Sequence, residues 1–172
     1  MGESNVPARR AHTSIVTIEI ERKFVLKEIP RADVLGTGEA LRQGYVAEED
    51  GVAVRVRITE RAATLTVKAG AGLTRTEVEV AISRDDAEAL WPHTEGRRID
   101  KTRHRVAHGD LGDVVADIDV YAGALAGLCT AEVEFGSEDE ARAFAPPSWF
   151  GREVTGEAGW SNSALARHGL PH

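Results

Sequence analysis

Two glutamates and a lysine alternate near the start of the chain, at Glu19, Glu21 and Lys23. Successive side chains of a β-strand point to opposite faces, so in an extended segment all three project from one face. Two carboxylates about 6.6 Å apart along a strand can share or flank hard divalent cations. The lysine adds a compact positive charge suited to phosphate. This segment therefore predicts a face that binds a metal together with a polyanion.

The same alternation of charged and apolar residues recurs along the chain. One face of the predicted strands carries the bases Lys23, Arg55, Arg57, Lys68, Arg75, Lys101, Arg103 and Arg105. The same face carries the acids Glu19, Glu21, Glu77, Glu79, Asp117, Asp119, Glu132 and Glu134. Any single pair is common on a solvated edge, but a solvated outer face would also be diluted with Thr, Ser and Gln. The repetition instead indicates an inward, water-filled lumen lined by charge.

Antiparallel β-strands must position these residues. The eight expected strands span residues 15–26, 40–48, 52–60, 63–69, 73–82, 97–107, 112–121 and 129–136. Short turns such as 49–51 and 70–72 make neighbouring strands antiparallel. The fold class expected is α+β, an eight-stranded antiparallel β-barrel with helices packed outside.

Helices are expected to cover the apolar outer face of this barrel. A short helix or turn follows Arg31, and two helices begin after the N-capping residues Ser83 and Ser137. A last helix covers 161–168. The apolar residues suited to the covering role are Leu90, Trp91, Phe144 and Leu165. A barrel that these helices left partly bare would be covered by a second copy, so a homodimer is also considered.

Length and composition restrict the class of protein. The 172 residues are about one domain, expected over 14–172 after a disordered tail at 1–13 that contains no signal or membrane-spanning run. The net charge of −7 argues against binding to nucleic acid or to an acidic membrane. The single cysteine, Cys129, excludes an internal disulfide and indicates a reducing, cytoplasmic compartment.

The segment Glu19-Ile20-Glu21-Arg22-Lys23-Phe24 resembles the ExExK signature of the CYTH superfamily, the triphosphate tunnel metalloenzymes. The resemblance continues from about residue 15 to the C-terminus, through Gln43-Gly44-Tyr45, Arg55-Val56-Arg57, Lys68, Glu77-Val78-Glu79, Lys101-Thr102-Arg103, Asp119-Val120-Tyr121 and Glu132-Val133-Glu134. It implies a tunnel that binds a triphosphate and cleaves it with Mg²⁺ or Mn²⁺. Short bacterial members most often resemble inorganic triphosphatases. The alternatives are a thiamine triphosphatase, an adenylate cyclase, or a module that binds polyphosphate or nucleotide without cleaving it.

The resemblance also implies roles for matching residues. Lys23 and Tyr45 match a catalytic pair, although Tyr45 could instead be a packed aromatic at the tunnel mouth. The substrate-binding residues are expected to be Arg55, Arg57, Lys68, Arg75, Lys101 and Arg103. The metal ligands are expected to be Glu19, Glu21, Asp119, Glu132 and Glu134. Glu77 and Glu79 are expected to keep Arg55, Arg57 and Arg75 paired in the empty lumen, with metal binding as the alternative. Trp149 and Trp160 are expected to pack the C-terminal segment over the tunnel, with a lid that senses substrate as the alternative.

Overall fold

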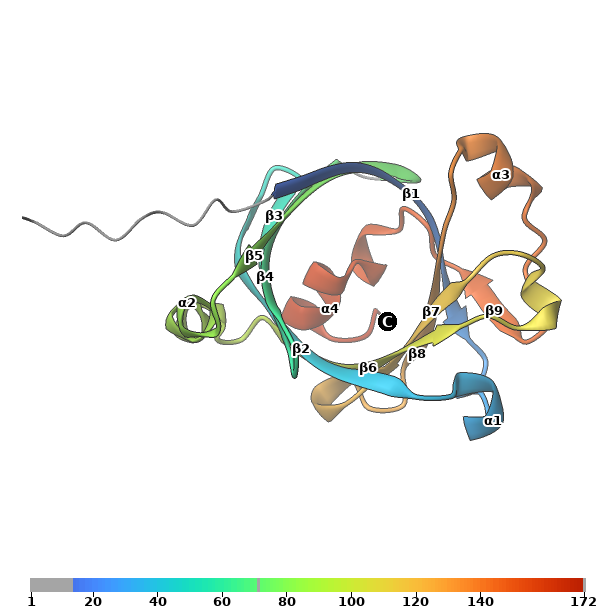
Figure 1. The fold of residues 1–172 in the computed structure, drawn as a ribbon, viewed down its shortest axis with the longest axis horizontal. Helices are drawn as coiled ribbons and strands as arrows, with labels where there is room; N and C mark the ends of the chain where they lie inside the picture. Colours follow the sequence, from blue (N-terminus) through green and yellow to red (C-terminus); the bar gives the residue numbers. More distant parts are fainter. Residues whose placement is uncertain (1–13, 71, 172) are drawn as a thin grey trace, which may run out of the picture.

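The structure is a computed structural model that describes residues 14–70 and 72–171, and it is a closed antiparallel β-barrel with four short helices (Figure 1). The eight barrel strands are β1 (Ser14–Leu26), β2 (Gly38–Glu49), β3 (Val52–Thr59), β4 (Ala63–Ala69), β5 (Thr74–Ile82), β6 (Arg98–Val106), β7 (Ala116–Tyr121) and β8 (Cys129–Glu134). They follow one another in the order β5-β4-β3-β2-β6-β7-β8-β1, and pairing of β1 with β5 closes the ring. The expected fold class is confirmed. The tail predicted at 1–13 lies outside the described residues.

A ninth strand, β9 (Phe150–Glu153), was not predicted. One edge of β1 pairs with β5 through residues 14–20, and then with β9 at Phe24 and Leu26. The N–H of Val154 donates to the carbonyl of Lys23 at 2.8 Å and continues this contact. The C-terminal segment therefore supports the part of β1 that carries Lys23.

Two apolar clusters cover the outer wall of the barrel, as the alternation of the strands predicted. In one cluster, Val56 and Ile58 of β3 pack with Ala87 of helix α2 (Arg84–Leu90). In the other, Phe24, Ile118 and Val133 pack with residues of helix α1 (Ala32–Leu35) and with neighbours of helix α3 (Glu138–Ala143). Burial of these side chains removes apolar surface from water and holds the strands around the lumen.

The helix starts follow the predicted capping residues. The hydroxyls of Ser83, Ser137 and Ser161 each accept a hydrogen bond from the backbone N–H three residues further on. Each bond satisfies one of the N–H groups that the first helical turn leaves without a partner. No helix of the described ranges is long and apolar enough to cross a membrane.

Helix α4 (Asn162–His168) lies across one opening of the barrel instead of on its outer wall (Figure 1). Its Leu165 packs against Ile99 and Tyr121, which share the inward strand face with Lys101. This differs from the expectation that Leu165 would cover the outside. The reason is that Ile99 and Tyr121 make this end of the lumen apolar, and an apolar helix residue gains by burial there.

Candidate active site

The barrel encloses a cavity of about 710 Å³, and the strand residues that line it are mainly charged. Every predicted site residue lines this cavity except Asp119, which is fully buried in its wall. The predicted residues that line it are Glu19, Glu21, Lys23, Tyr45, Arg55, Arg57, Lys68, Arg75, Lys101, Arg103, Glu132 and Glu134. The interpretation of the alternating charges as a lumen is confirmed for these residues. It is wrong for Arg105, which is exposed at the end of β6 and does not line the cavity.

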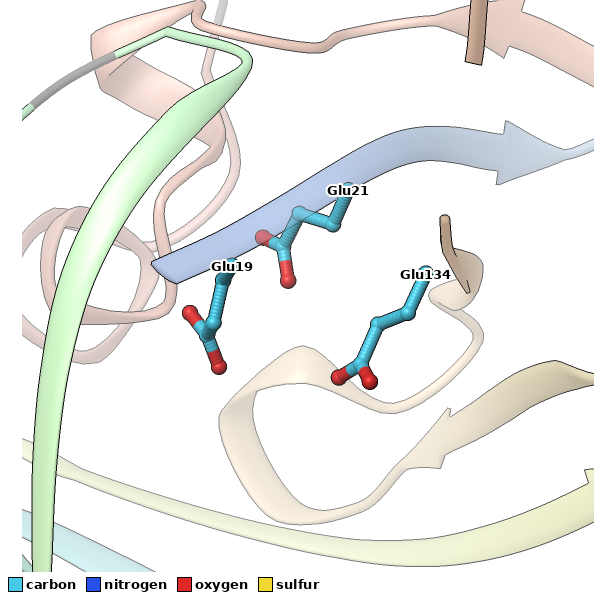
Figure 2. A group of neighbouring side chains, drawn as sticks. All are labelled: Glu19, Glu21 and Glu134. Atoms are coloured by element: carbon cyan, nitrogen blue, oxygen red, sulfur yellow. The ribbon is translucent and has the colours of Figure 1, made fainter. Parts of the chain in front are cut away.

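Three glutamates, which we call the acid triad, converge at one place on this wall: Glu19 and Glu21 of β1 and Glu134 of β8. One carboxylate oxygen from each lies within 4.8 Å of the others, and Figure 2 shows the three side chains facing a common space. Glu21 and Glu134 are direct partners in the strand register, and like charges in that position repel each other. A divalent cation would relieve this repulsion, and carboxylate oxygens are the donors that Mg²⁺ and Mn²⁺ prefer.

Two bases from neighbouring strands contact the acid triad. The Lys68 ammonium lies 2.8 Å from a Glu19 oxygen and 2.7 Å from a Glu77 oxygen. Arg75 is ion-paired with Glu21 and lies 3.9 Å from Glu19. Burial raises the pKa of Glu19, even though Lys68 opposes this shift. Arg75 is therefore neutralised by the triad, and not by Glu77 or Glu79 as the sequence predicted.

The other two predicted metal ligands form a separate network with three bases. Asp119 accepts hydrogen bonds from Lys101 at 2.5 Å and from Arg103 at 2.7 Å. Glu132 lies 3.0 Å from the Lys23 ammonium and accepts from Arg103 at 2.7 Å. Burial would raise the pKa of both acids, but these cations outweigh it and hold both values below the usual range. In this structure Asp119 and Glu132 act as counterions.

The two residues of the predicted catalytic pair are both buried in the lumen. Burial would lower the pKa of Lys23, but the carboxylates of Glu132 and Asp119 raise it above the usual value, so its ammonium stays charged. The Tyr45 hydroxyl accepts a hydrogen bond from Gln43 at 3.2 Å, and burial raises its pKa against the charges of Arg55 and Lys23. Lys23 is therefore held by Glu132, 3.0 Å away, whereas Tyr45 bonds to Gln43.

Arg55 and Arg57 differ in how completely they are neutralised. Arg57 donates two hydrogen bonds to the Glu79 carboxylate, at 2.9 and 3.1 Å. Arg55 donates to the Thr66 hydroxyl at 3.2 Å, lies 3.9 Å from Glu79, and its buried Nε has no hydrogen-bond partner. A buried donor without a partner is costly. Arg55 therefore keeps a buried donor that is free to bond to another group in the lumen.

A bulge in β2 brings one further acid into the cavity. The register between β2 and β3 shifts between Tyr45 and Ala47, so strict alternation fails beyond that point and Glu48 lines the lumen. Glu48 accepts a hydrogen bond from Ser163 at 2.9 Å and lies 3.3 Å from Arg167. These contacts anchor α4 across the opening. Sequence reasoning missed them because a bulge leaves no mark in the alternation.

The two tryptophans expected over the tunnel have different surroundings. Trp160 lines the cavity together with the residues of α4, as predicted. Trp149 packs against Phe150, with ring centroids 4.6 Å apart, in the cluster on the outer wall. Only Trp160 therefore belongs to the segment that covers the opening.

Fold and site together define a β-barrel protein that can hold a polyanion and a divalent metal in one enclosed space. The sequence matches the CYTH domain over residues 17–155, and the chain belongs to this family, as the ExExK resemblance indicated. It is 44% identical over 150 residues to an inorganic triphosphatase of Nitrosomonas europaea, covering 86% of this chain and 96% of that protein. It is 33% identical over 152 residues to an inorganic triphosphatase of Acetivibrio thermocellus, covering 87% and 94% of the two chains.

Solved structures agree with these relatives. A crystal structure of an inorganic triphosphatase matches with a TM-score of 0.64 at 41% identity, and the match covers 89% of this chain and 97% of that one. A putative adenylate cyclase of Bacillus halodurans matches with a TM-score of 0.55 at 18% identity, which shows a shared fold.

Proposed function

We propose that this protein is a divalent-metal-dependent inorganic triphosphatase that hydrolyses the terminal phosphoryl group of tripolyphosphate inside the barrel. The observation that carries the proposal is the placement of the acid triad and the basic residues around one enclosed cavity of about 710 Å³. The two curated relatives with this activity cover most of the chain and support it.

The acid triad would hold the metal, Mg²⁺ or Mn²⁺. When bound, such an ion neutralises phosphate oxygens and promotes ionisation of an attacking water. Glu134 is suited to this role because it makes no ion pair with any described residue, whereas Glu19 and Glu21 must exchange a base for the metal. Asp119 and Glu132 remain predicted ligands, but their contacts support a role as counterions.

The basic residues would bind the phosphate chain. Guanidinium groups of Arg55, Arg57 and Arg103 can form paired hydrogen bonds with phosphoryl oxygens, while Lys68 and Lys101 supply compact charges. Lys23 keeps its charge in the buried site and can offset the charge that develops during in-line attack. This assignment needs the substrate to be a strong anion, because it must compete with carboxylates that already contact these bases.

Phosphate release tests the proposal. Tripolyphosphate, ATP and thiamine triphosphate are each supplied with Mg²⁺ or Mn²⁺, and the products are identified. We expect phosphate and pyrophosphate from tripolyphosphate at a higher kcat/KM than from either organic substrate. Formation of cyclic AMP from ATP as the main reaction, or binding of tripolyphosphate without turnover under either metal, contradicts it. A cytoplasmic location and a homodimer remain predictions from the sequence.

A further inference from the structure

The first residue of helix α4 contacts Glu132, the counterion of Lys23. This residue, Asn162, accepts a hydrogen bond at Oδ1 from the Tyr121 hydroxyl at 2.7 Å. Its Nδ2 donates to Glu132 Oε1 at 3.5 Å. The same Glu132 oxygen lies 3.0 Å from the Lys23 ammonium. A continuous polar chain therefore joins the C-terminal helix to the proposed catalytic lysine.

The chemistry of this chain fixes its direction. The Glu132 carboxylate accepts a hydrogen bond from Arg103 at 2.7 Å and lies 3.0 Å from the Lys23 ammonium, so its oxygens act as acceptors. The amide of Asn162 must therefore present its NH₂ group to Glu132 and its oxygen to Tyr121. Burial also raises the pKa of Tyr121, which keeps its hydroxyl protonated as the donor. The neighbours of each group therefore decide whether it donates or accepts in this chain.

We propose that Asn162 and Tyr121 are positioning residues: they hold the Glu132 carboxylate and, through it, the Lys23 ammonium in the geometry required for phosphoryl transfer. Asn162 lies on α4 and Tyr121 on β7, so the lysine is held correctly only while α4 lies across the opening. The inference rests on the proposed role of Lys23. Neither residue belongs to the acid triad or contacts it.

Kinetics of Tyr121→Phe and Asn162→Ala provide the first test. Both changes remove one link of the chain and keep the residues that bind phosphate. We expect kcat for tripolyphosphate to fall by about ten- to a hundredfold, because small displacements of a catalytic group have effects of this size, with KM changed by less than about threefold. The double variant should lose no more activity than the more severe of the two single variants, since both residues act through one chain.

Ser163→Ala is the matched control. Ser163 lies beside Asn162, and its replacement removes the 2.9 Å bond to Glu48 but no link of the chain to Lys23. Helix α4 keeps its other anchors, because Arg167 still lies 3.3 Å from Glu48 and Leu165 still packs against Ile99 and Tyr121. We expect its kcat to stay within about twofold of the parent protein. Thermal unfolding of all variants identifies any that fail to fold, and Tyr121→Phe is the milder change for that case.

The ammonium of Lys23 gives a readout that does not depend on activity. In ¹⁵N-labelled protein, a lysine NH₃⁺ group held by hydrogen bonds exchanges slowly with water, and Lys23→Arg assigns its signal. We expect the signal to broaden or disappear in Tyr121→Phe and in Asn162→Ala, and to persist in Ser163→Ala. An unchanged signal and kcat in both chain variants, or the same losses in Ser163→Ala, would overturn the inference. Absence of triphosphatase activity in the parent protein would defeat the proposed function separately.

Discussion

The ammonium of Lys68, on β4, lies 2.8 Å from Glu19, a member of the acid triad on β1. It thus places a positive charge on a carboxylate that the metal would also use. A metal at the triad would compete with Lys68 for Glu19. When a phosphate is bound, its oxygens can accept hydrogen bonds from the Lys68 ammonium and so leave Glu19 to the metal. Metal and substrate should therefore favour each other's binding.

Lys68→Met should change metal and substrate binding in opposite directions. Loss of the competing cation should tighten Mn²⁺ binding by about tenfold, given the size of Coulomb interactions at this range. Tripolyphosphate binding should weaken, because one phosphate contact is lost. Isothermal titration with each ligand alone measures both effects. Weaker binding of Mn²⁺ would show that Lys68 supports the triad and does not compete with it.

Glu134→Gln should weaken the metal site without leaving a base unpaired, since Glu134 has no ion-pair partner among the described residues. We expect the Kd for Mn²⁺ to rise by at least about tenfold, because even the loss of a residue that only supports a metal ligand costs this much. Activity should recover in part at high metal concentration. Glu28→Gln is the control, because Glu28 is an exposed acid in the bend that follows β1. Equal effects of both changes would point to general electrostatics.

Two arginines should respond differently to replacement by methionine. Arg55→Met removes a guanidinium whose Nε has no partner, so stability should stay within about 0.5 kcal/mol of the parent or increase. Its KM for tripolyphosphate should rise by about ten- to a hundredfold, which corresponds to a charged hydrogen bond. Arg103→Met leaves Asp119 and Glu132 short of a counterion and should cost about 3–5 kcal/mol. Urea unfolding and substrate kinetics distinguish them; equal loss of stability contradicts the contrast.

Substrate binding should weaken above about pH 8. Burial lowers the pKa of Lys101 to about 8, with Asp119 opposing the shift. Above that pH the amine loses its proton and with it the charge that attracts phosphate, so KM rises as pH increases. Lys101→Arg keeps its charge at all these values and should move the rise to higher pH. KM profiles between pH 6 and 10 decide this, and coincident profiles for the two proteins would exclude Lys101 as the cause.

The strands could be predicted because their signal is local. Alternate charges at Arg55 and Arg57, or at Lys101 and Arg103, fix which face turns inward without knowledge of the neighbours. The division of the acids could not be predicted in the same way. Glu134 joins the acid triad and Glu132 becomes a counterion because the register places them opposite Glu21 and Lys23. Register depends on how distant strands meet.

The C-terminal segment shows the second limit of the sequence. Ser161 correctly marked the start of α4, but its position inside the opening depends on apolar residues of other strands. β9 has four residues, too few for an alternation to be recognised, and it gains its place from a free stretch on the edge of β1. Local patterns identify such elements poorly because tertiary contacts decide them.

Strand β1 pairs with strands that lie far from it in the sequence. β1 pairs with β5, β8 and β9, and its Arg22 bonds to Glu153, a residue 131 positions later. During synthesis the ribosome releases β1 first, so its apolar side stays without a cover until almost all of the protein has been made. Contacts between such distant residues slow folding. A nascent chain interrupted before β9 would therefore be inactive and prone to aggregate.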